Sequence, residues 1–486
     1  MSSENTQGTR SRNALFPVLM FLLAIIIAAS GSMTLPMDGH ETFVVQTTQE
    51  MHDRNDWIVP WFNGEPRLNK PPLNYWITGA TAWMSGSLDH IGAWHGRFAS
   101  ILAALGMAIL TFIAGTMLYG RRVAVLAASF LVTSLGYFNY SHDARPDMLY
   151  AALCTAGYVA FIFVWKADGS RKWTWSALLM WAAYALATLS KGPHMPAMYL
   201  VASIVFCCLR RMSAREIMGL FRPVAGLILY AVITLPWWYF VQSKLGGTSL
   251  HSTQLGGSLL TVRFDQFFNL YYFYRPLILV LPWLIFLPHT ILHFRHRNTR
   301  RDSDTLLVLY ILVPASILSF GSQERWFYML PSLPPMIILL ATGADYMLEQ
   351  RKDPPKFFRL LLSLCLATGI AYAVAGFLQA GWSKERFELQ KLSQHALTLM
   401  QPAIPVYTLD LYPDAFVYYL HTRIMQEKSM DAIMKNLATS GPGQALVIMN
   451  TFAVKAIPKQ IPYRIIYTTQ GKQNKTLTLV ILNPSS

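Results

Sequence analysis

Long apolar segments alternate with short charged ones along most of the chain. A bilayer core of about 30 Å needs roughly 20 apolar residues per helix. We therefore predict eleven spans: Leu15–Leu35, Phe98–Leu118, Val123–Tyr140, Met148–Trp165, Trp175–Leu189, Met195–Leu209, Val224–Val241, Tyr271–Leu292, Leu306–Phe320, Phe327–Met347 and Phe358–Leu378. Two of them are short, and Tyr75–Met84 can add a half-span or an interfacial helix. The pattern predicts a polytopic α-helical membrane protein with about eleven to thirteen transmembrane helices.

Composition supports this fold class. The chain has 486 residues, of which 53% are hydrophobic and 13% charged, whereas soluble domains carry about 25% charged residues. That balance excludes a water-soluble enzyme, a disordered chain and a coiled coil. The net charge of +15 does not indicate nucleic acid, because the basic residues lie between apolar segments. The four cysteines show no disulfide framework and no metal-binding spacing.

The basic residues also predict an orientation. Lys and Arg gather in alternate loops: Arg121–Arg122, Lys166–Lys172, Arg210–Arg222, Arg295–Arg301 and Arg351–Arg359. Cytoplasmic loops carry this excess in membrane proteins. Arg10 and Arg12 precede the first span, which we interpret as a retained signal anchor. The prediction is a multi-pass protein of the plasma (inner) membrane with a cytoplasmic N-terminus.

The last part of the chain is too polar to span a membrane. Its pattern predicts strands at Ile404–Leu409 and Ala445–Asn450, helices at Asp414–Leu420 and Met430–Leu437, and a hairpin from Tyr463–Tyr467 and Thr476–Leu482. We therefore predict a membrane domain at residues 1–378, with an extracytoplasmic catalytic loop at 35–97. A small extracytoplasmic (periplasmic) α/β domain follows at residues 379–486.

Ionisable residues are costly at membrane depth, and in this chain they gather at the outer ends of spans. The clusters are Asp38, His40 and Glu41; Lys70; His142, Asp143, Arg145 and Asp147; Lys191 and His194; and Glu324 and Arg325. Each has a structural alternative: the aspartates are good helix caps, and Lys70 can reach lipid headgroups as a snorkelling side chain. Their convergence at one leaflet favours a single site.

Several of these segments resemble one family. Met37–Thr42, Asp56–Pro60, Asn69–Trp76, Ala144–Met148, Ser190–Pro193 and Arg325–Pro335 are similar, in order, to motifs of the lipid A aminoarabinose transferase-like enzymes. These enzymes are relatives of the dolichyl-phosphate-mannose protein mannosyltransferases in the GT-C superfamily. The resemblance covers roughly residues 15–350. It implies a GT-C fold and inverting sugar transfer from a polyprenyl-phosphate donor at the outer face of the membrane.

The resemblance also implies roles for residues. The family usually has Asp-Glu where this chain has His40-Glu41, so Asp38 or His40 takes the acceptor-activating part, with Glu41 beside it. The carry-over makes Lys70, Lys191 and Arg325 the donor-phosphate ligands, and it places Asp143, Arg145, Asp147 and Tyr328 in the same site. A divalent cation is a possible cofactor, although Asn69 replaces a carboxylate that the family often has before Lys70.

We therefore expect a membrane glycosyltransferase. Its donor would be undecaprenyl phosphate-aminoarabinose or a similar lipid-linked sugar, and its acceptor lipid A, another lipid or glycan, or a protein. Beyond these and the surrounding membrane lipids, no nucleic-acid partner is expected. The alternative is a lipid-linked sugar flippase or transporter. Transporters usually show internal repeats and polar residues near mid-bilayer, and neither is clear here. A third alternative, a non-catalytic anchor, would not need clustered acids and bases.

Overall fold

The chain forms two compact units. The computed structural model describes residues 18–167, 172–246, 268–296, 301–321, 324–378, 383–401, 404–440, 443–470 and 476–483. Unit 1 comprises residues 1–30, 68–77 and 97–376. Unit 2 comprises residues 31–67, 78–96 and 377–486. The basic positions 10 and 12 of the predicted N-terminal anchor lie outside the described residues.

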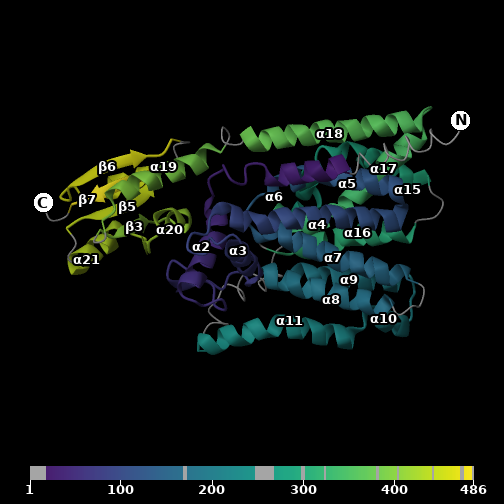
Figure 1. Ribbon diagram of the computed structural model, residues 1–486, viewed down its shortest axis with the longest axis horizontal. Coiled ribbons are helices and arrows are strands. Elements are labelled where there is room, and N and C mark those ends of the chain that lie inside the picture. Colours follow the sequence, from purple (N-terminus) through teal and green to yellow (C-terminus); the bar gives the residue numbers. More distant parts are fainter. Residues whose placement is uncertain are drawn as a thin grey trace. The chain divides into compact units, whose positions relative to one another are not determined.

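Unit 1 is helical (Figure 1). After an unlabelled helix at Val18–Ala29, its helices are α4 (Ala93–Tyr119), α5 (Arg121–Val132), α6 (Leu135–Tyr140), α7 (Pro146–Lys166), α8 (Lys172–Lys191), α9 (His194–Leu209), α10 (Ala214–Phe221), α11 (Pro223–Lys244), α14 (Tyr271–Tyr274), α15 (Leu287–His296), α16 (Asp302–Leu318), α17 (Leu333–Glu349) and α18 (Pro354–Leu378). Three 3₁₀ segments, η1 (Arg275–Val280), η2 (Trp283–Phe286) and η3 (Trp326–Ser332), complete it. The predicted polytopic helical class is confirmed.

The predicted spans coincide with these helices, and two of them are broken. Val123–Tyr140 divides into α5 and α6, because Ser134 caps the second helix by accepting a hydrogen bond from the Tyr137 amide. Over the described ranges, five helices are long and apolar enough to cross a membrane. The bent pair Tyr271–Val280 and Trp283–His296, which meets at 109°, would make a sixth. The total of eleven to thirteen spans stays a prediction.

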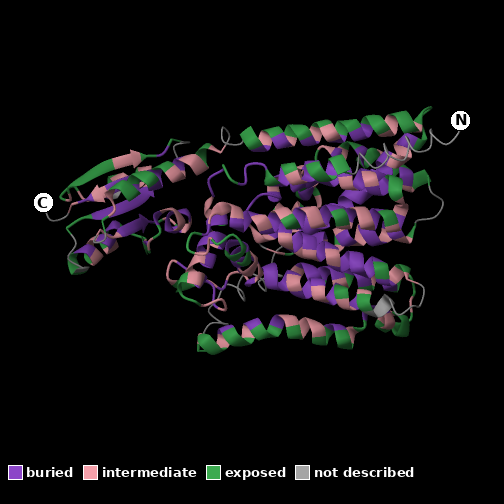
Figure 2. Cartoon of the chain, in the orientation of Figure 1, coloured by how far each residue is buried: buried purple, intermediate pink, exposed green. Residues whose placement is uncertain are grey.

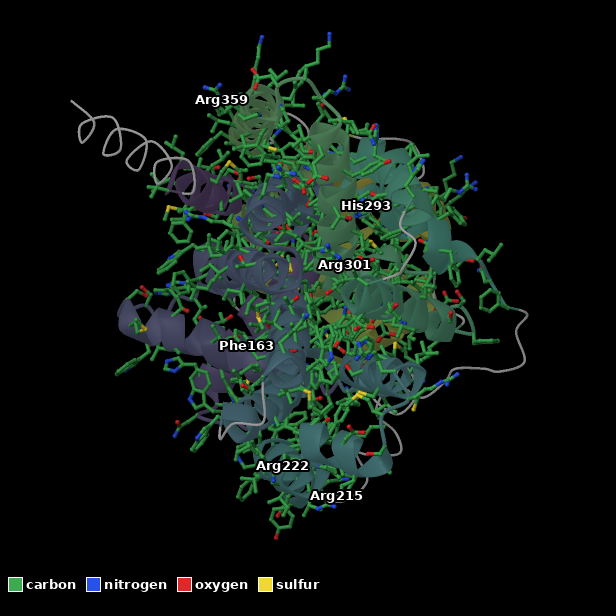
Figure 3. The ribbon with its side chains drawn as sticks, turned by 90° about the vertical axis from the view of Figure 1, so that its right-hand side faces the viewer. Phe163, Arg215, Arg222, His293, Arg301 and Arg359 are labelled. Atoms are coloured by element: carbon green, nitrogen blue, oxygen red, sulfur yellow. The ribbon has the colours of Figure 1, made fainter. Side chains whose placement is uncertain are left out.

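The burial pattern of unit 1 is that of a bundle surrounded by apolar solvent. Figure 2 shows α11 and α18 mostly exposed, while the helices between them carry the buried side chains. The exposed positions of α11 are apolar, among them Leu227, Ile228 and Val232. In water such a surface would be unfavourable, so it indicates contact with lipid tails. Arg215, Arg222, Arg301 and Arg359 lie at one end of the bundle, the end that faces the viewer in Figure 3.

Unit 2 contains a five-stranded sheet. Its strands are β3 (Val406–Leu409), β4 (Met425–Glu427), β5 (Ala445–Asn450), β6 (Tyr463–Thr468) and β7 (Leu477–Leu482), in the order β4-β3-β5-β7-β6. The β3 strand is parallel to both of its neighbours, and β7 is antiparallel to β5 and β6. Its helices are α19 (Lys384–Leu399), α20 (Asp414–Leu420) and α21 (Met430–Ser440), with a short 3₁₀ segment, η5 (Thr451–Ala456). The small α/β region near the C-terminus is confirmed.

Strand alternation builds two small cores on this sheet. In β5, Leu446 and Ile448 belong to one buried cluster, whereas Val447 and Met449 belong to the other. Successive side chains of a strand point to opposite faces, so both faces of the central strand are covered. Phe62, from the loop predicted at residues 35–97, belongs to the first cluster and is 4% exposed. The loop thus contributes to the core that the tail builds.

The segment predicted as a loop at residues 35–97 has its own elements. In unit 2 they are α2 (Gly39–Asp53) and the two-stranded ribbon of β1 (Trp61–Phe62) and β2 (Glu65–Pro66). The loop continues into α3 (Leu73–Met84). The α2 helix packs against α20. The sequence-based division at residue 378 stays a prediction, and the structure adds that residues 31–67 and 78–96 belong to the same compact unit as the tail.

Candidate active site

The centre of the candidate site in unit 1 is a buried ion pair. Lys191, the last residue of α8, pairs with the Asp147 carboxylate in the first turn of α7. Each residue is only 6% exposed. Pro146 begins α7, a position where the absent N–H costs nothing. A buried ammonium and carboxylate persist only when they are paired and hydrogen-bonded, so each of these two side chains fixes the other.

Aromatic rings surround the ammonium group. Lys191 Nζ lies 4.5 Å from the ring centroid of Tyr328, 5.3 Å from that of Phe327 and 5.7 Å from that of Tyr150. An aromatic face attracts a cation at these distances. The Tyr150 hydroxyl donates to the Gly192 carbonyl at 2.9 Å and accepts from the Met195 amide at 3.0 Å. The turn after Lys191 is therefore held on two sides.

Lys70 is brought to the same place by the segment that contains it. Asn74 in the first turn of α3 donates from Nδ2 to the Ser190 carbonyl at 3.2 Å and to Ser190 Oγ at 3.1 Å. Lys70 lies within electrostatic range of Asp147. The α8 helix is followed by Gly192, whose φ of +119° lies in the region that glycine tolerates best. The Asn74 contact thus links the Lys70 segment to the end of α8.

The remaining residues predicted around Asp147 are also near it. Arg145 lies within electrostatic range of Asp147 and places Nε 3.7 Å from Asp143 Oδ2. The loop that holds them is fixed by Ser100, which donates to the Asp143 carbonyl at 2.6 Å and to the Arg145 carbonyl at 3.2 Å. Asp143 is 7% exposed. The structure therefore brings Lys70, Lys191 and residues 143–147 close together, and their action as one site stays a prediction.

Arg325 approaches the cluster through Tyr328. Its guanidinium donates to the Tyr328 hydroxyl at 3.3 Å, and its amide donates to the Tyr272 hydroxyl at 3.1 Å. The ring of the same tyrosine contacts the Lys191 ammonium. Arg325 is exposed, unlike Lys191. The cluster thus contains one buried and one exposed cation, and both contact Tyr328.

The predicted acid cluster lies in unit 2, at the start of α2. Asp38 caps this helix: its Oδ1 accepts from the His40 and Glu41 amides, both at 2.9 Å. The Glu41 carboxylate accepts from the Asp38 amide in return, which completes a capping box. His40 is exposed, whereas Glu41 is fully buried. The structural alternative considered for Asp38 and Glu41 is therefore present.

A residue of the tail completes that cluster. Arg386 in α19 donates to Glu41 Oε2 at 2.6 Å and to Asp38 Oδ2 at 3.2 Å. It also reaches the Pro36 carbonyl at 3.4 Å. The sequence pattern did not predict α19, so it gave no reason to place an arginine here.

Asp414 is a second residue that the sequence analysis missed. It begins α20, and its carboxylate lies so close to Gly39 that an added Cβ would be 2.0 Å from Asp414 Oδ2. Thr42 Oγ1 donates to the Asp414 carbonyl at 3.1 Å. Burial raises the pKa of Asp414, and the nearby charge of Asp38 acts in the same direction. The Ala415 amide and His40 oppose the shift. A carboxyl group with a raised pKa therefore lies close to His40.

No group of three or more His, Cys, Asp or Glu side chains within the described ranges is arranged to hold a metal ion. The possible divalent cation stays a prediction.

The known sequences that this chain matches are those of sugar transferases. A model of the dolichyl-phosphate-mannose-protein mannosyltransferase family matches residues 69–240. The undecaprenyl phosphate-α-4-amino-4-deoxy-L-arabinose arabinosyl transferase of Pectobacterium carotovorum is 24% identical over 362 residues, which are 74% of this chain and 64% of that protein. Its counterpart in Edwardsiella ictaluri is 26% identical over 335 residues, 66% of this chain and 58% of that one. The matches thus span only about six-tenths of these relatives.

Solved structures show the same fold. The crystal structure of ArnT from Cupriavidus metallidurans bound to undecaprenyl phosphate aligns with a TM-score of 0.73 and 17% identity, covering 98% of both chains. The oligosaccharyltransferase of Archaeoglobus fulgidus in its apo form aligns with a TM-score of 0.56 and 11% identity, covering 90% of this chain and 70% of that one.

The protein is therefore a membrane-embedded helical protein with the fold of the GT-C glycosyltransferases. The sequence matches make the relationship more specific. They confirm the family resemblance that the motifs predicted, and the chain is related to the lipid A aminoarabinose transferase-like and protein mannosyltransferase-related membrane glycosyltransferases.

Proposed function

We propose that the protein transfers a sugar from a polyprenyl-phosphate donor to an envelope acceptor, such as lipid A, another glycan or a protein. The observation that carries this proposal is the buried Lys191–Asp147 pair with Lys70 and Arg145 close to it. More cations than carboxylates meet there, and a lipid-linked phosphate is a ligand that suits such an excess. The names of the relatives support undecaprenyl phosphate as the lipid and aminoarabinose as one candidate sugar.

The proposed sugar transfer needs only the two substrates and side chains of this protein. The bond between the anomeric carbon and the donor phosphate oxygen breaks, and a bond to the acceptor oxygen forms with inversion. Lys70, Lys191 and Arg325 stabilise the negative charge that grows on the leaving polyprenyl phosphate. Preorganised cations are most effective where water is scarce, and Lys191 is buried among aromatic rings. Tyr328 and Asp147 hold these cations in place.

We assign proton abstraction from an acceptor hydroxyl to His40. Both oxygens of Asp38 already accept hydrogen bonds, from the α2 amides and from Arg386. Glu41 is fully buried and paired with Arg386, so it is poorly placed to take up a proton. His40 is exposed in the first turn of the same helix. An imidazole is a common general base near neutral pH. Asp38 and Glu41 then orient the helix that presents His40.

We further propose the orientation of the protein in a plasma (inner) membrane. The arginine-rich end of unit 1 in Figure 3 would be cytoplasmic by the positive-inside rule, and unit 2 extracytoplasmic. In intact cells, a membrane-impermeant thiol reagent should label Lys428→Cys and leave Arg215→Cys unlabelled. The reverse labelling would invert this topology.

The experiment that tests the function measures release of free polyprenyl phosphate by purified protein from a native lipid extract. The wild-type protein should release it, and Lys70→Ala should lower the rate about 10²–10³-fold, the size expected for one lost electrostatic contact. Lys352→Ala is the matched control, because Lys352 is an exposed lysine of unit 1 outside the candidate site. Absence of release by folded wild-type protein, in an extract shown to contain donor and acceptor, would favour the flippase or transporter alternative.

A further inference from the structure

Unit 2 contains a polar cavity that the proposed catalytic step does not use. Its volume is about 380 Å³, and it opens between the C-terminal half of α2, the turn of the β1–β2 ribbon and the segment after α20. Its lining includes Gln46, Glu50, Asp53, Arg54 and Arg423. This volume lies in the range of small-molecule sites, and the mostly polar lining suits a polar ligand.

The cavity walls are held in place by hydrogen bonds. The Glu50 carboxylate accepts from the Asn63 and Gly64 amides at 2.7 and 3.0 Å. The Asn63 side chain then joins the ribbon to the tail, because it donates to the Ile424 carbonyl and accepts from the Ile424 amide, both at 2.8 Å. These contacts hold the walls of the cavity in fixed positions relative to one another, which lowers the entropic cost of binding a ligand there.

Backbone strain gathers at the same place. Six non-glycine residues of the described chain have positive φ, and two of them, Asn63 at +56° and His421 at +48°, line this cavity. Gly64, at +78°, lines it as well. Such conformations cost free energy and cluster at ligand sites.

Two polar groups of the lining retain unused hydrogen-bonding capacity. Gln46 is only 8% exposed; its Nε2 donates to Glu50 at 3.1 Å, and its Oε1 has no hydrogen-bond partner among the described residues. The guanidinium of Arg54 lies 4.3 Å above the Trp61 ring and makes no hydrogen bond or ion pair within the part of the chain that the structure describes. The other lining arginine, Arg423, is instead paired with Glu65 at 2.8 Å.

We propose that this cavity binds a phosphorylated saccharide. The free Arg54 guanidinium suits a phosphate group, to which arginine can donate two parallel hydrogen bonds. Gln46 Oε1 and the Asp53 carboxylate are acceptors for sugar hydroxyls. Identifying this saccharide with the headgroup of the acceptor rests on the proposed function, whereas the binding itself does not.

The test measures binding to the purified full-length protein without donor, so it does not depend on turnover. The probe is glucose 1-phosphate, with glucose and inorganic phosphate as its two fragments, followed by saturation-transfer NMR. Glucose 1-phosphate should bind more tightly than either fragment. Arg54→Gln should weaken its binding about tenfold or more, because a charge-assisted hydrogen bond is lost. Arg464→Gln is the matched control, since Arg464 is an exposed arginine of unit 2 that is absent from the cavity lining, and it should bind as the wild type does.

A second variant separates binding from folding. Gln46→Leu should weaken binding of glucose 1-phosphate and leave that of inorganic phosphate unchanged, a difference that misfolding would not produce. Equal affinity of the wild type for inorganic phosphate and glucose 1-phosphate would overturn the saccharide assignment. Absence of binding by the wild type, or unchanged binding by Arg54→Gln, would overturn the site. If the binding result holds while no polyprenyl phosphate is released, the proposed function fails and the cavity assignment stands.

Discussion

The two units contain clusters of opposite charge. Around Lys191 in unit 1, four cations (Lys70, Arg145, Lys191 and Arg325) meet two carboxylates, Asp143 and Asp147. At the start of α2 in unit 2, three carboxylates (Asp38, Glu41 and Asp414) meet one guanidinium, that of Arg386. Both clusters include a buried ion pair between residues far apart in the chain. What differs is the sign of the charge that is left over.

That difference separates two chemical tasks. An excess of positive charge stabilises the negative charge on a phosphate leaving group. An excess of negative charge raises the pKa of neighbouring groups, which helps one of them to take up a proton. The ion pairs themselves are weak evidence of function, because buried pairs also serve structure. The comparison therefore has to be tested by variants that remove a charge but keep the fold.

The largest effect is expected at Lys191. Lys191→Met leaves Asp147 buried without its lysine partner, which should lower the free energy of unfolding by about 3–5 kcal/mol and the rate of polyprenyl phosphate release by about 10²–10³-fold. In the double variant Lys191→Met/Asp147→Leu, apolar side chains replace the pair. Its apparent melting temperature should recover while the rate does not. If the rate recovers together with the melting temperature, the pair is structural only.

The next largest effect shows whether His40 or Asp38 acts as the general base. His40→Gln should lower the rate of transfer to an acceptor hydroxyl about 10²–10⁴-fold, the usual contribution of a general base, with little change in melting temperature. Asp38→Asn should act mainly on stability, by about 1 kcal/mol or less, because asparagine caps a helix as well as aspartate does but loses the charge that pairs with Arg386. Both are measured by steady-state transfer assays beside thermal unfolding.

A change of acceptor makes that contrast sharper. An acceptor that offers an ionised phosphate needs no base, so His40→Gln should transfer to it at nearly the wild-type rate. An Asp38→Asn enzyme that stays folded but shows the larger rate loss would instead make Asp38 the base.

Hydrophobic periodicity predicted those elements of both units whose own sequence contains a buried apolar face or run. In the tail, α20 and β5 have the predicted bounds, because Asp414 starts the one and a continuous apolar run forms the other. The unpredicted elements are those that depend on distant partners. Met425–Glu427 is a short polar edge strand, made a strand by pairing with β3. The α19 helix has a polar sequence, and its buried Glu388 is stabilised by the Gln470 amide and the Tyr467 hydroxyl, both at 2.8 Å.

The same limit applies to the sites. Motif order placed Lys70, Asp147 and Lys191 in one cluster, because each sits next to a proline or at a helix end that the chain itself marks. Arg386 and Asp414 carry no such local signal. They reach the start of α2 only because the first loop and the tail form one compact unit, a long-range contact that a single sequence does not encode in any short pattern.

The smallest effect, and the most specific to unit 2, is a pH dependence at Asp414. Burial raises the pKa of this carboxyl group, so the folded protein holds a proton that the unfolded chain releases once the pH exceeds the ordinary aspartate value. Stability therefore falls as the pH rises from that value through the raised one. Asp414→Asn removes the ionisation and keeps an oxygen that can accept from the Ala415 amide. At pH 7 this variant should melt on the order of a degree or two above the wild type, and the difference should vanish near pH 3.

Thermal unfolding of both proteins across this pH range checks the prediction. The matched control is Asp431→Asn, on the exposed first turn of α21. If Asp414→Asn is less stable than the wild type at pH 7, the folded protein favours the ionised Asp414 carboxylate. The surroundings of α2 would then stabilise the negative charge of its carboxylates without binding a proton.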